Sequence, residues 1–172
     1  MAEPTLSVRL IAILFVATEP ITAARLADVT DTSLEEVQEA LSSLQNSTRK
    51  DGICVSVLDG HYRLVSAPEA AATVRRFLQE ESSSELSRSA LETLAIIAYR
   101  GPLTKTRIEA IRGVASDTML RNLLARGLVV TAGKSTDPGR PDLYAISHGF
   151  LQHFGLTSQT ELPPVPETDH ED

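Results

Sequence analysis

Residues 14–22 read LFVATEPIT, and residues 96–104 read IIAYRGPLT. In both segments an apolar run ends shortly before a proline, and a threonine follows that proline two residues later. Proline cannot continue a helix, and a threonine hydroxyl is a good N-terminal cap. Each segment therefore predicts the end of one helix and the start of the next.

The two segments belong to an internal repeat. Pro20 and Pro102 are 82 residues apart, and the same offset joins further residues of similar type on either side of them. These pairs are Thr22 with Thr104, Arg25 with Arg107, Leu26 with Ile108 and Tyr62 with Tyr144. Self-similarity at one fixed offset predicts two copies of the same fold.

The first copy predicts three helices. A densely apolar helix runs from Leu6 to Ala17, and a short helix capped by Thr22 follows it. A third helix opens at Thr32 or Ser33, each of which has a glutamate three residues later, as in a capping box. The apolar residues of this helix recur at spacings of three and four, which defines one face: Leu34, Val37, Leu41 and Leu44.

A two-stranded hairpin follows these helices in the first copy. Apolar residues alternate from Ile53 to Val57, Asp59-Gly60 is a tight-turn signal, and the alternation resumes from Tyr62 to Leu64. Cys54 lies inside the first strand and is expected to be a small core residue. A closing helix after Pro68 is expected to bury Val74, Phe77 and Leu78.

The second copy repeats this order. An apolar stripe from Leu91 to Ala98 predicts its first helix, Thr104 caps a short helix ended by Gly113, and Ser116 caps a third helix ended by Gly127. The hairpin is expected as a strand over Leu128–Ala132, a polar loop over 133–140 and a return strand over Leu143–Ile146.

Three helices followed by a two-stranded hairpin indicate a winged helix, which is a helix-turn-helix with a hairpin wing. The predicted fold class is mainly α with small β-hairpins (α+β), in two tandem winged-helix domains. We expect the N-terminal domain at 1–80, a Glu/Ser-rich linker at 81–87 and the C-terminal domain at 88–157. Residues 158–172 are rich in proline and acidic residues, which predicts a flexible, disordered tail.

Composition argues against an enzyme or a membrane protein. The four histidines have no metal-ligand spacing, the single cysteine has no partner, and scattered histidines of this kind are usually surface residues. No cofactor is indicated. The longest apolar run, Leu10 to Ala17, is shorter than the roughly 18 residues of a membrane helix. A lone cysteine fits the reducing cytoplasm.

Charge tests whether the helix-turn-helix reads DNA. The third helix of the first copy begins among Asp31, Glu35, Glu36 and Glu39, and these carboxylates would repel phosphates. Residues 88–147 instead carry 9 basic and 5 acidic residues. Direct DNA contact by the second domain therefore stays open but is not favoured. The alternative function is a winged-helix transcriptional regulator that binds DNA through this basic domain.

The second copy contains a distinctive set of motifs. LAIIAYRGPLT at 94–104 leads to IRGVASD at 111–117, LARGL at 124–128, Gly139-Arg140-Pro141 before Leu143-Tyr144, and FLQHFGL at 150–156. This pattern closely resembles the segregation and condensation protein B family, the chromosome-condensation subunit of bacteria. The resemblance runs from about Leu6 to Glu167 and is most specific from Leu91 to Leu156.

The resemblance implies a role without catalysis. It implies a homodimer formed through the first domain, which binds the kleisin subunit (segregation and condensation protein A) and through it the SMC ATPase. The expected function is support of chromosome condensation and segregation during cell division, in the cytoplasm and associated with the nucleoid.

Two hypotheses place these contacts on residues. Nearly every residue from Leu10 to Ala17 is apolar, more than one core face requires, so we expect Ile11, Leu14 and Phe15 to supply dimer surface. Kleisin contacts are expected on the second domain at Arg121, Arg126, Gly139, Arg140, Pro141 and Tyr144. The sequence leaves open the alternative that the Gly139-Arg140-Pro141 motif only shapes the wing.

Overall fold

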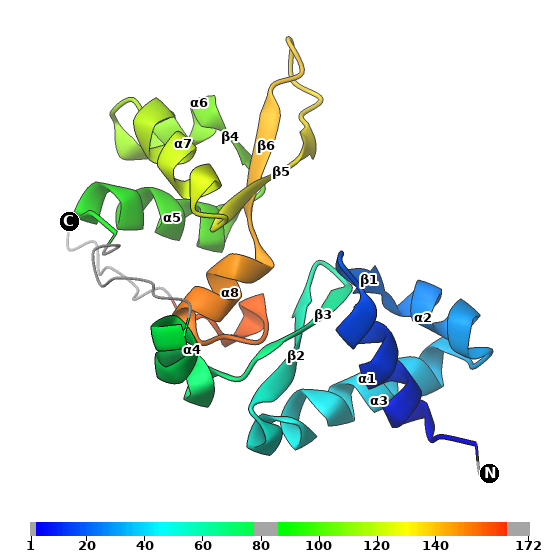
Figure 1. The fold of residues 1–172 in the computed structure, drawn as a ribbon. Helices are drawn as coiled ribbons and strands as arrows, with labels where there is room; N and C mark the ends of the chain where they lie inside the picture. The colour runs from blue at the N-terminus through cyan, green and yellow to red at the C-terminus, as the bar shows by residue number, and fades with distance from the viewer. Residues whose placement is uncertain (1–2, 78–85, 165–172) are drawn as a thin grey trace.

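The computed structural model describes residues 3–77 and 86–164, which we call the first half and the second half. The first half contains α1 (Leu6–Val16), β1 (Ile21–Thr22), α2 (Ala23–Thr30), α3 (Leu34–Ser47), β2 (Ile53–Leu58), β3 (His61–Ser66) and α4 (Ala71–Phe77). The second half contains α5 (Arg88–Arg100), β4 (Leu103–Thr104), α6 (Lys105–Arg112), α7 (Asp117–Ala125), β5 (Val129–Lys134), β6 (Asp142–Ile146) and α8 (His148–Phe154). The fold is therefore a mixed α+β fold (Figure 1).

The two halves repeat one arrangement of helices and strands. Within the described residues each half has a three-stranded antiparallel sheet, in the order β1-β3-β2 and β4-β6-β5. Ile21 pairs with Tyr62 in the first sheet, and Leu103 pairs with Tyr144 in the second. Both partners are displaced by the 82 residues found in the sequence, so the repeat extends to the register of the strands.

Local sequence explains where the helices begin. The hydroxyls of Thr22 and Thr104 accept hydrogen bonds from the third residue beyond each of them, as predicted. Of the two candidate caps for α3, Ser33 is the one used, and it forms a complete capping box with Glu36. The prediction that Ser116 caps α7 is wrong: its hydroxyl makes no cap and instead accepts a hydrogen bond from the Arg112 guanidinium at 3.0 Å.

Each half has its own apolar core. The first core is built mainly from buried leucines and valines of α1, α2, α3 and β2, including Leu10, Leu26 and Leu41. The second core gathers buried residues of α5, α6, α7, β5, β6 and α8. Cys54 is fully buried in β2, as predicted, and burial raises the pKa of its thiol.

Two expectations about the segment between the two copies need correction. Phe77 was expected to be buried by a closing helix, but 83% of it is exposed on the short α4, while Val74 is half-buried. Most of the predicted linker, residues 81–85, lies outside the described residues, and so does Leu78. Leu86 packs against the second core, so it belongs to the second half rather than to a linker.

The predicted start of the flexible tail, residue 158, is also wrong. Gln159 donates a hydrogen bond to the Ala98 carbonyl of α5 at 2.9 Å, and the Tyr99 hydroxyl donates one to the Pro163 carbonyl at 2.7 Å. Leu162 packs against the second core. Residues 157–163 are thus held in place, and the rest of the predicted tail, 165–172, lies outside the described residues.

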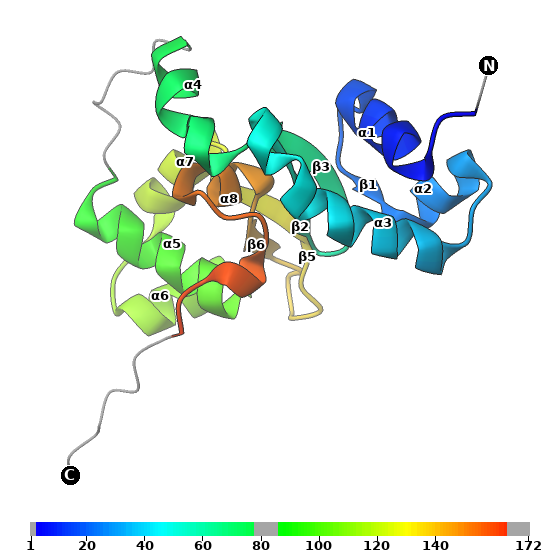
Figure 2. The same ribbon diagram turned by 90° about the horizontal axis from the view of Figure 1, so that it is seen from below.

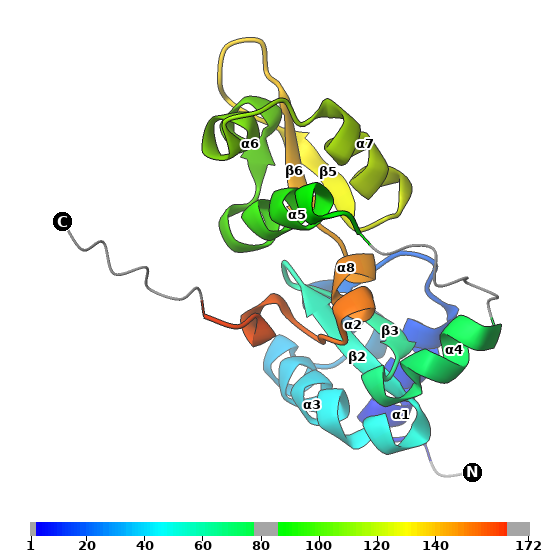
Figure 3. The ribbon, with the colours of Figure 1, turned by 90° about the vertical axis from the view of Figure 1, so that its left-hand side faces the viewer.

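The two halves contact each other through α8. Figures 1 and 3 show α8 between the two sheets, and Figure 2 shows the segment after α8 passing beside α5. Leu58, at the end of β2, packs into the second core. This contact gives the two halves a defined relative arrangement, which the sequence left open.

Candidate functional site

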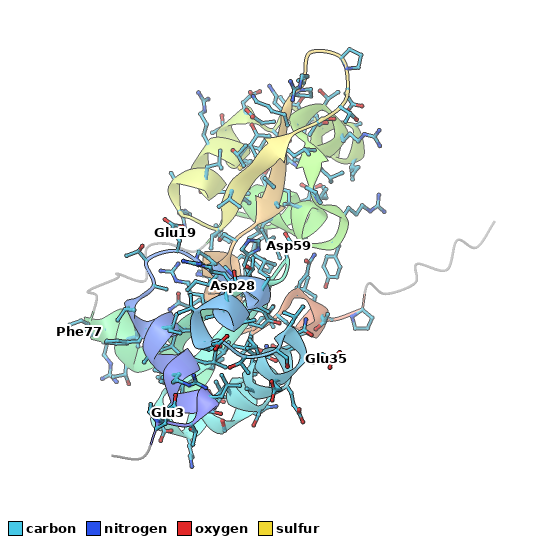
Figure 4. The ribbon with its side chains drawn as sticks, turned by 90° about the vertical axis from the view of Figure 1, so that its right-hand side faces the viewer. Glu3, Glu19, Asp28, Glu35, Asp59 and Phe77 are labelled. Carbon is cyan, nitrogen blue, oxygen red and sulfur yellow. The ribbon has the colours of Figure 1, made fainter. Side chains whose placement is uncertain are left out.

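Helix α1 is apolar on two opposite sides. Its inward side fills the first core with Leu10 and Leu14, which are 0% and 2% exposed. Its outward side carries exposed apolar residues at Val8, Ala12, Phe15 and Val16, which we call the α1 stripe. These positions are three, four and seven residues apart, or adjacent, so they share one helix face. Figure 4 shows Glu3 and Glu19 beyond the two ends of this helix, where they give the stripe an acidic border.

The three predicted dimer residues separate in the structure. Phe15 is 76% exposed and lies in the α1 stripe. Ile11 is half-buried and packs against the first core, and Leu14 is almost fully buried in it. Leu14 is therefore wrong as a surface residue, because it serves the chain's own core. Val8 and Val16 were missed, although they stand at helical spacing from Phe15 and Ala12.

Acidic residues mark the start of α3. Glu35 and Glu36 occupy its first turn, where carboxylates complement the helix dipole. The hydroxyl and the backbone N–H of Ser33 donate hydrogen bonds to Glu36, and these lower the pKa of that carboxyl. Glu36 stays ionised, so this end of α3 presents negative charge to any partner.

Several of the second half's cations are already paired. Lys105 lies 2.5 Å from Asp117, and this hydrogen bond raises the pKa of the lysine and lowers that of the aspartate. Lys134 and Asp142 pair at 2.7 Å across the hairpin. The side chain of Arg112 is only 3% exposed. These pairs leave the net charge of this half unchanged, but they engage the side chains of Lys105 and Lys134 with carboxylates of the same half.

The predicted partner-binding residues do not form one patch. Arg121 is exposed on α7, and Tyr144 is half-buried on β6 against the second core. Arg126 lines a cleft of about 250 Å³ together with residues of α4 and α8. Figure 1 shows the β5–β6 loop, which carries Arg140, extending away from α8 and hence from that cleft.

The wing motif has an unusual backbone. Gly139 and Arg140 both have positive φ angles, of 83° and 44°. The Arg140 N–H donates to the Asp137 carbonyl at 2.9 Å, and the Ser135 N–H donates to the Pro141 carbonyl at 2.8 Å. This turn tightens the loop and leaves the Arg140 side chain exposed. A left-handed arginine is uncommon, so the motif shapes the wing and presents a cation at the same time.

One histidine expected at the surface is instead buried. His148 is 9% exposed at the start of α8, and its Nδ1 lies 3.0 Å from the hydroxyl of Ser56 on β2. Sequence spacing could not pair two residues 92 positions apart. No cluster of three metal-ligating side chains occurs in residues 3–77 and 86–164, and no helix described there is long and apolar enough to cross a membrane.

Comparison with known proteins identifies relatives along almost the whole chain. The family described as segregation and condensation complex subunit ScpB matches residues 9–165. Segregation and condensation protein B of Symbiobacterium thermophilum is 44% identical over 156 residues, which are 90% of this chain and 71% of that protein.

Solved structures include similar chains. The crystal structure of ScpB from Mycobacterium tuberculosis is 35% identical and is aligned over 91% of this chain and 100% of its own, with a TM-score of 0.44. A dimer of the ScpB N-terminal domain complexed with an ScpA peptide is 24% identical over 41% of this chain and 91% of its own, with a TM-score of 0.38. On the family match and the sequence identity, the chain belongs to the segregation and condensation complex subunit ScpB family.

Proposed function

We propose that this protein is a non-catalytic subunit of the bacterial SMC–kleisin complex, and that it acts as a homodimer that binds the kleisin subunit, ScpA. Through the kleisin it reaches the SMC ATPase and supports chromosome condensation and segregation. The observation that carries this proposal is the family match, which spans residues 9–165 and leaves out little of the chain. Its place of action is the cytoplasm, at the nucleoid.

Each half is proposed to be a winged-helix domain. The order helix, short strand, two helices and two strands is the one a winged helix requires, and both halves have it. We place the first domain at 1–80 and the second at 86–156, with residues 157–163 packed across both. In this arrangement α3 and α7 are the helices that would face DNA in a regulator.

The α1 stripe is the proposed dimer surface. Large apolar side chains that remain exposed together on one face favour association, because removing apolar surface from water lowers the free energy. Phe15 and Val16, 76% and 73% exposed, supply most of that area. A twofold dimer would bring two copies of the stripe together with their acidic borders at the rim.

The wing of the second domain is the proposed kleisin contact. Arg140 is exposed on a tight turn, and an arginine held there can meet a carboxylate of a bound segment. Arg140→Glu should weaken kleisin binding about tenfold or more, since it replaces attraction by repulsion. The matched control is Arg107→Glu on α6, an exposed arginine outside the predicted contact residues. Equal affinity of Arg140→Glu and wild type, with both proteins folded, would restrict the motif to shaping the wing.

Co-elution with the kleisin tests the proposal. The purified chain and the central segment of the kleisin from the same genome are mixed and run on size exclusion with light scattering. We expect one complex whose mass contains two copies of this chain. Separate elution, together with salt-dependent binding to duplex DNA by the second domain, would instead favour the transcriptional regulator.

A further inference from the structure

The contact between the halves includes a strand-like extension of the first sheet. We call residues 155–163, which follow α8, the strap. The Val57 N–H donates to the Thr157 carbonyl at 2.8 Å, and Val57 forms a parallel bridge with Ser158. The strap therefore covers the outer edge of β2 at Val57, where a backbone group would otherwise be open to another chain.

Beside the strap, a polar pair is enclosed between the halves. Ser56 on β2 is 1% exposed and His148 on α8 is 9% exposed, and their Oγ and Nδ1 atoms lie 3.0 Å apart. The other ring nitrogen of His148, Nε2, is buried and has no hydrogen-bond partner within the described residues. Whichever tautomer the ring adopts, one buried nitrogen is unsatisfied.

The surroundings of His148 oppose a positive charge on its ring. The strands packed against α8 bring His61 and Arg63 from β3, and the turn between β2 and β3 brings Asp59. His148 lines a second cleft between the halves, and Glu19 and Asp59 are the carboxylates that line it. On α8 itself, His153 is the other titratable side chain. Burial and the positive charge of Arg63 outweigh the opposing effect of Asp59.

We propose that the docking of α8 and the strap on the first half is a releasable latch, and that the latch opens when His148 takes up a proton. The proton would place a charge in an enclosed site and leave the buried Nε2–H without an acceptor. Opening would free the edge of β2 and change the angle between the two proposed winged helices. This device goes beyond the proposed function, because it concerns the relative placement of the binding faces.

The pKa of His148 gives the direction of this response. Burial first, and then Arg63, hold it below its ordinary value of 6.5. The docked form thus favours the neutral ring. Docking is therefore most stable above the pKa of the undocked ring, where His148 is neutral in both forms, and it becomes less stable as the pH falls. Below pH about 6.5 the ratio of undocked to docked protein should rise about tenfold per pH unit, until the docked ring also titrates.

Distances between the halves measure the latch directly. Nitroxide labels are placed at the exposed positions Glu39 on α3 and Thr118 on α7, in a Cys54→Ala background of the full chain. Labelled chains are diluted into unlabelled chains, so that each dimer contains one labelled chain. We expect a single narrow distance distribution at pH about 7.5, and a second, broader population at pH about 5.5.

Matched variants assign the response to the polar pair. Ser56→Ala combined with His148→Phe replaces both partners by apolar groups, which should keep the halves docked at both pH values. His153→Phe, five residues further along α8, should keep the wild-type response. If the double variant does not fold, His148→Gln should also abolish the pH response, because it cannot take up a proton.

Three results would overturn the latch. They are an unchanged distance distribution of the wild type between the two pH values, an equal shift in the double variant or in His148→Gln, and a broad distribution already at neutral pH. Titration of the His148 ring by nuclear magnetic resonance gives a second readout. A ring that titrates at the same pH as that of His153 would also contradict the proposal.

Discussion

Replacing Phe15 by alanine should weaken the proposed dimer and leave the fold intact. Phe15 is 76% exposed, so it contributes little to the core of its own chain. Complete burial of a phenylalanine side chain contributes about 1.5–3 kcal/mol. Covering the exposed part therefore contributes about 1–2 kcal/mol for each copy.

The effect is doubled by symmetry. In a twofold interface each substituted residue occurs twice, so Phe15→Ala should cost the dimer about 2–4 kcal/mol. Since about 1.4 kcal/mol corresponds to a factor of ten, the dissociation constant should rise roughly 30- to 1,000-fold. Sedimentation equilibrium over a range of protein concentrations measures this constant.

Two matched variants separate this effect from a general loss of apolar surface. Phe77→Ala removes an equally exposed phenylalanine, 83% exposed on α4, and should leave the dissociation constant unchanged. Leu14→Ala empties part of the core and should lower the free energy of unfolding by about 2–5 kcal/mol. An unchanged dissociation constant for Phe15→Ala would refute the assignment of the α1 stripe as the dimer surface.

Three further substitutions test the local structure by urea unfolding. Ser33→Ala should cost about 0.5–2 kcal/mol by removing a helix cap. Because the pKa of Glu36 is held below its ordinary 4.5, the capping contact is present above that pH, and the difference between variant and wild type should shrink on acidification below it. Arg112→Met should cost about 2–4 kcal/mol, since it removes the buried guanidinium that donates hydrogen bonds to the hydroxyls of Ser89 and Ser116. Gly101→Ala should cost about 1–3 kcal/mol, because its Cβ would lie 2.5 Å from the Ile97 carbonyl oxygen. An unfolding free energy equal to that of wild type in any of these would contradict the contact concerned.

Much of the fold could be predicted because its signals are local. Helix caps, the Asp59-Gly60 turn and strand alternation each depend on a few neighbouring residues. Because the sequence repeats, the same order of elements is predicted independently from each copy. The equivalence of the Ile21–Tyr62 and Leu103–Tyr144 pairs follows from that repeat. The family resemblance came from the second copy, and it is shown by the comparisons.

The features that were missed depend on residues far apart in the chain. His148 could not be placed in the interior, because it begins helix α8 and its partner Ser56 is on β2 of the other half. The part of the strap from residue 158 onward was predicted to be a flexible tail, since its composition is polar and the strap's contacts, with Val57 and Ala98, are supplied by both halves. Periodicity identified α1 as apolar but did not say which side its own core uses, and so Leu14 was misplaced.

The most direct test of the central claim is a calorimetric titration of the full chain with the central segment of its kleisin, repeated at several temperatures. We expect saturable binding, one stoichiometry and a negative heat-capacity change, because apolar surface is buried when the two proteins associate. Absence of heat at every temperature, together with no co-elution, would contradict the claim that this protein is a kleisin-binding subunit.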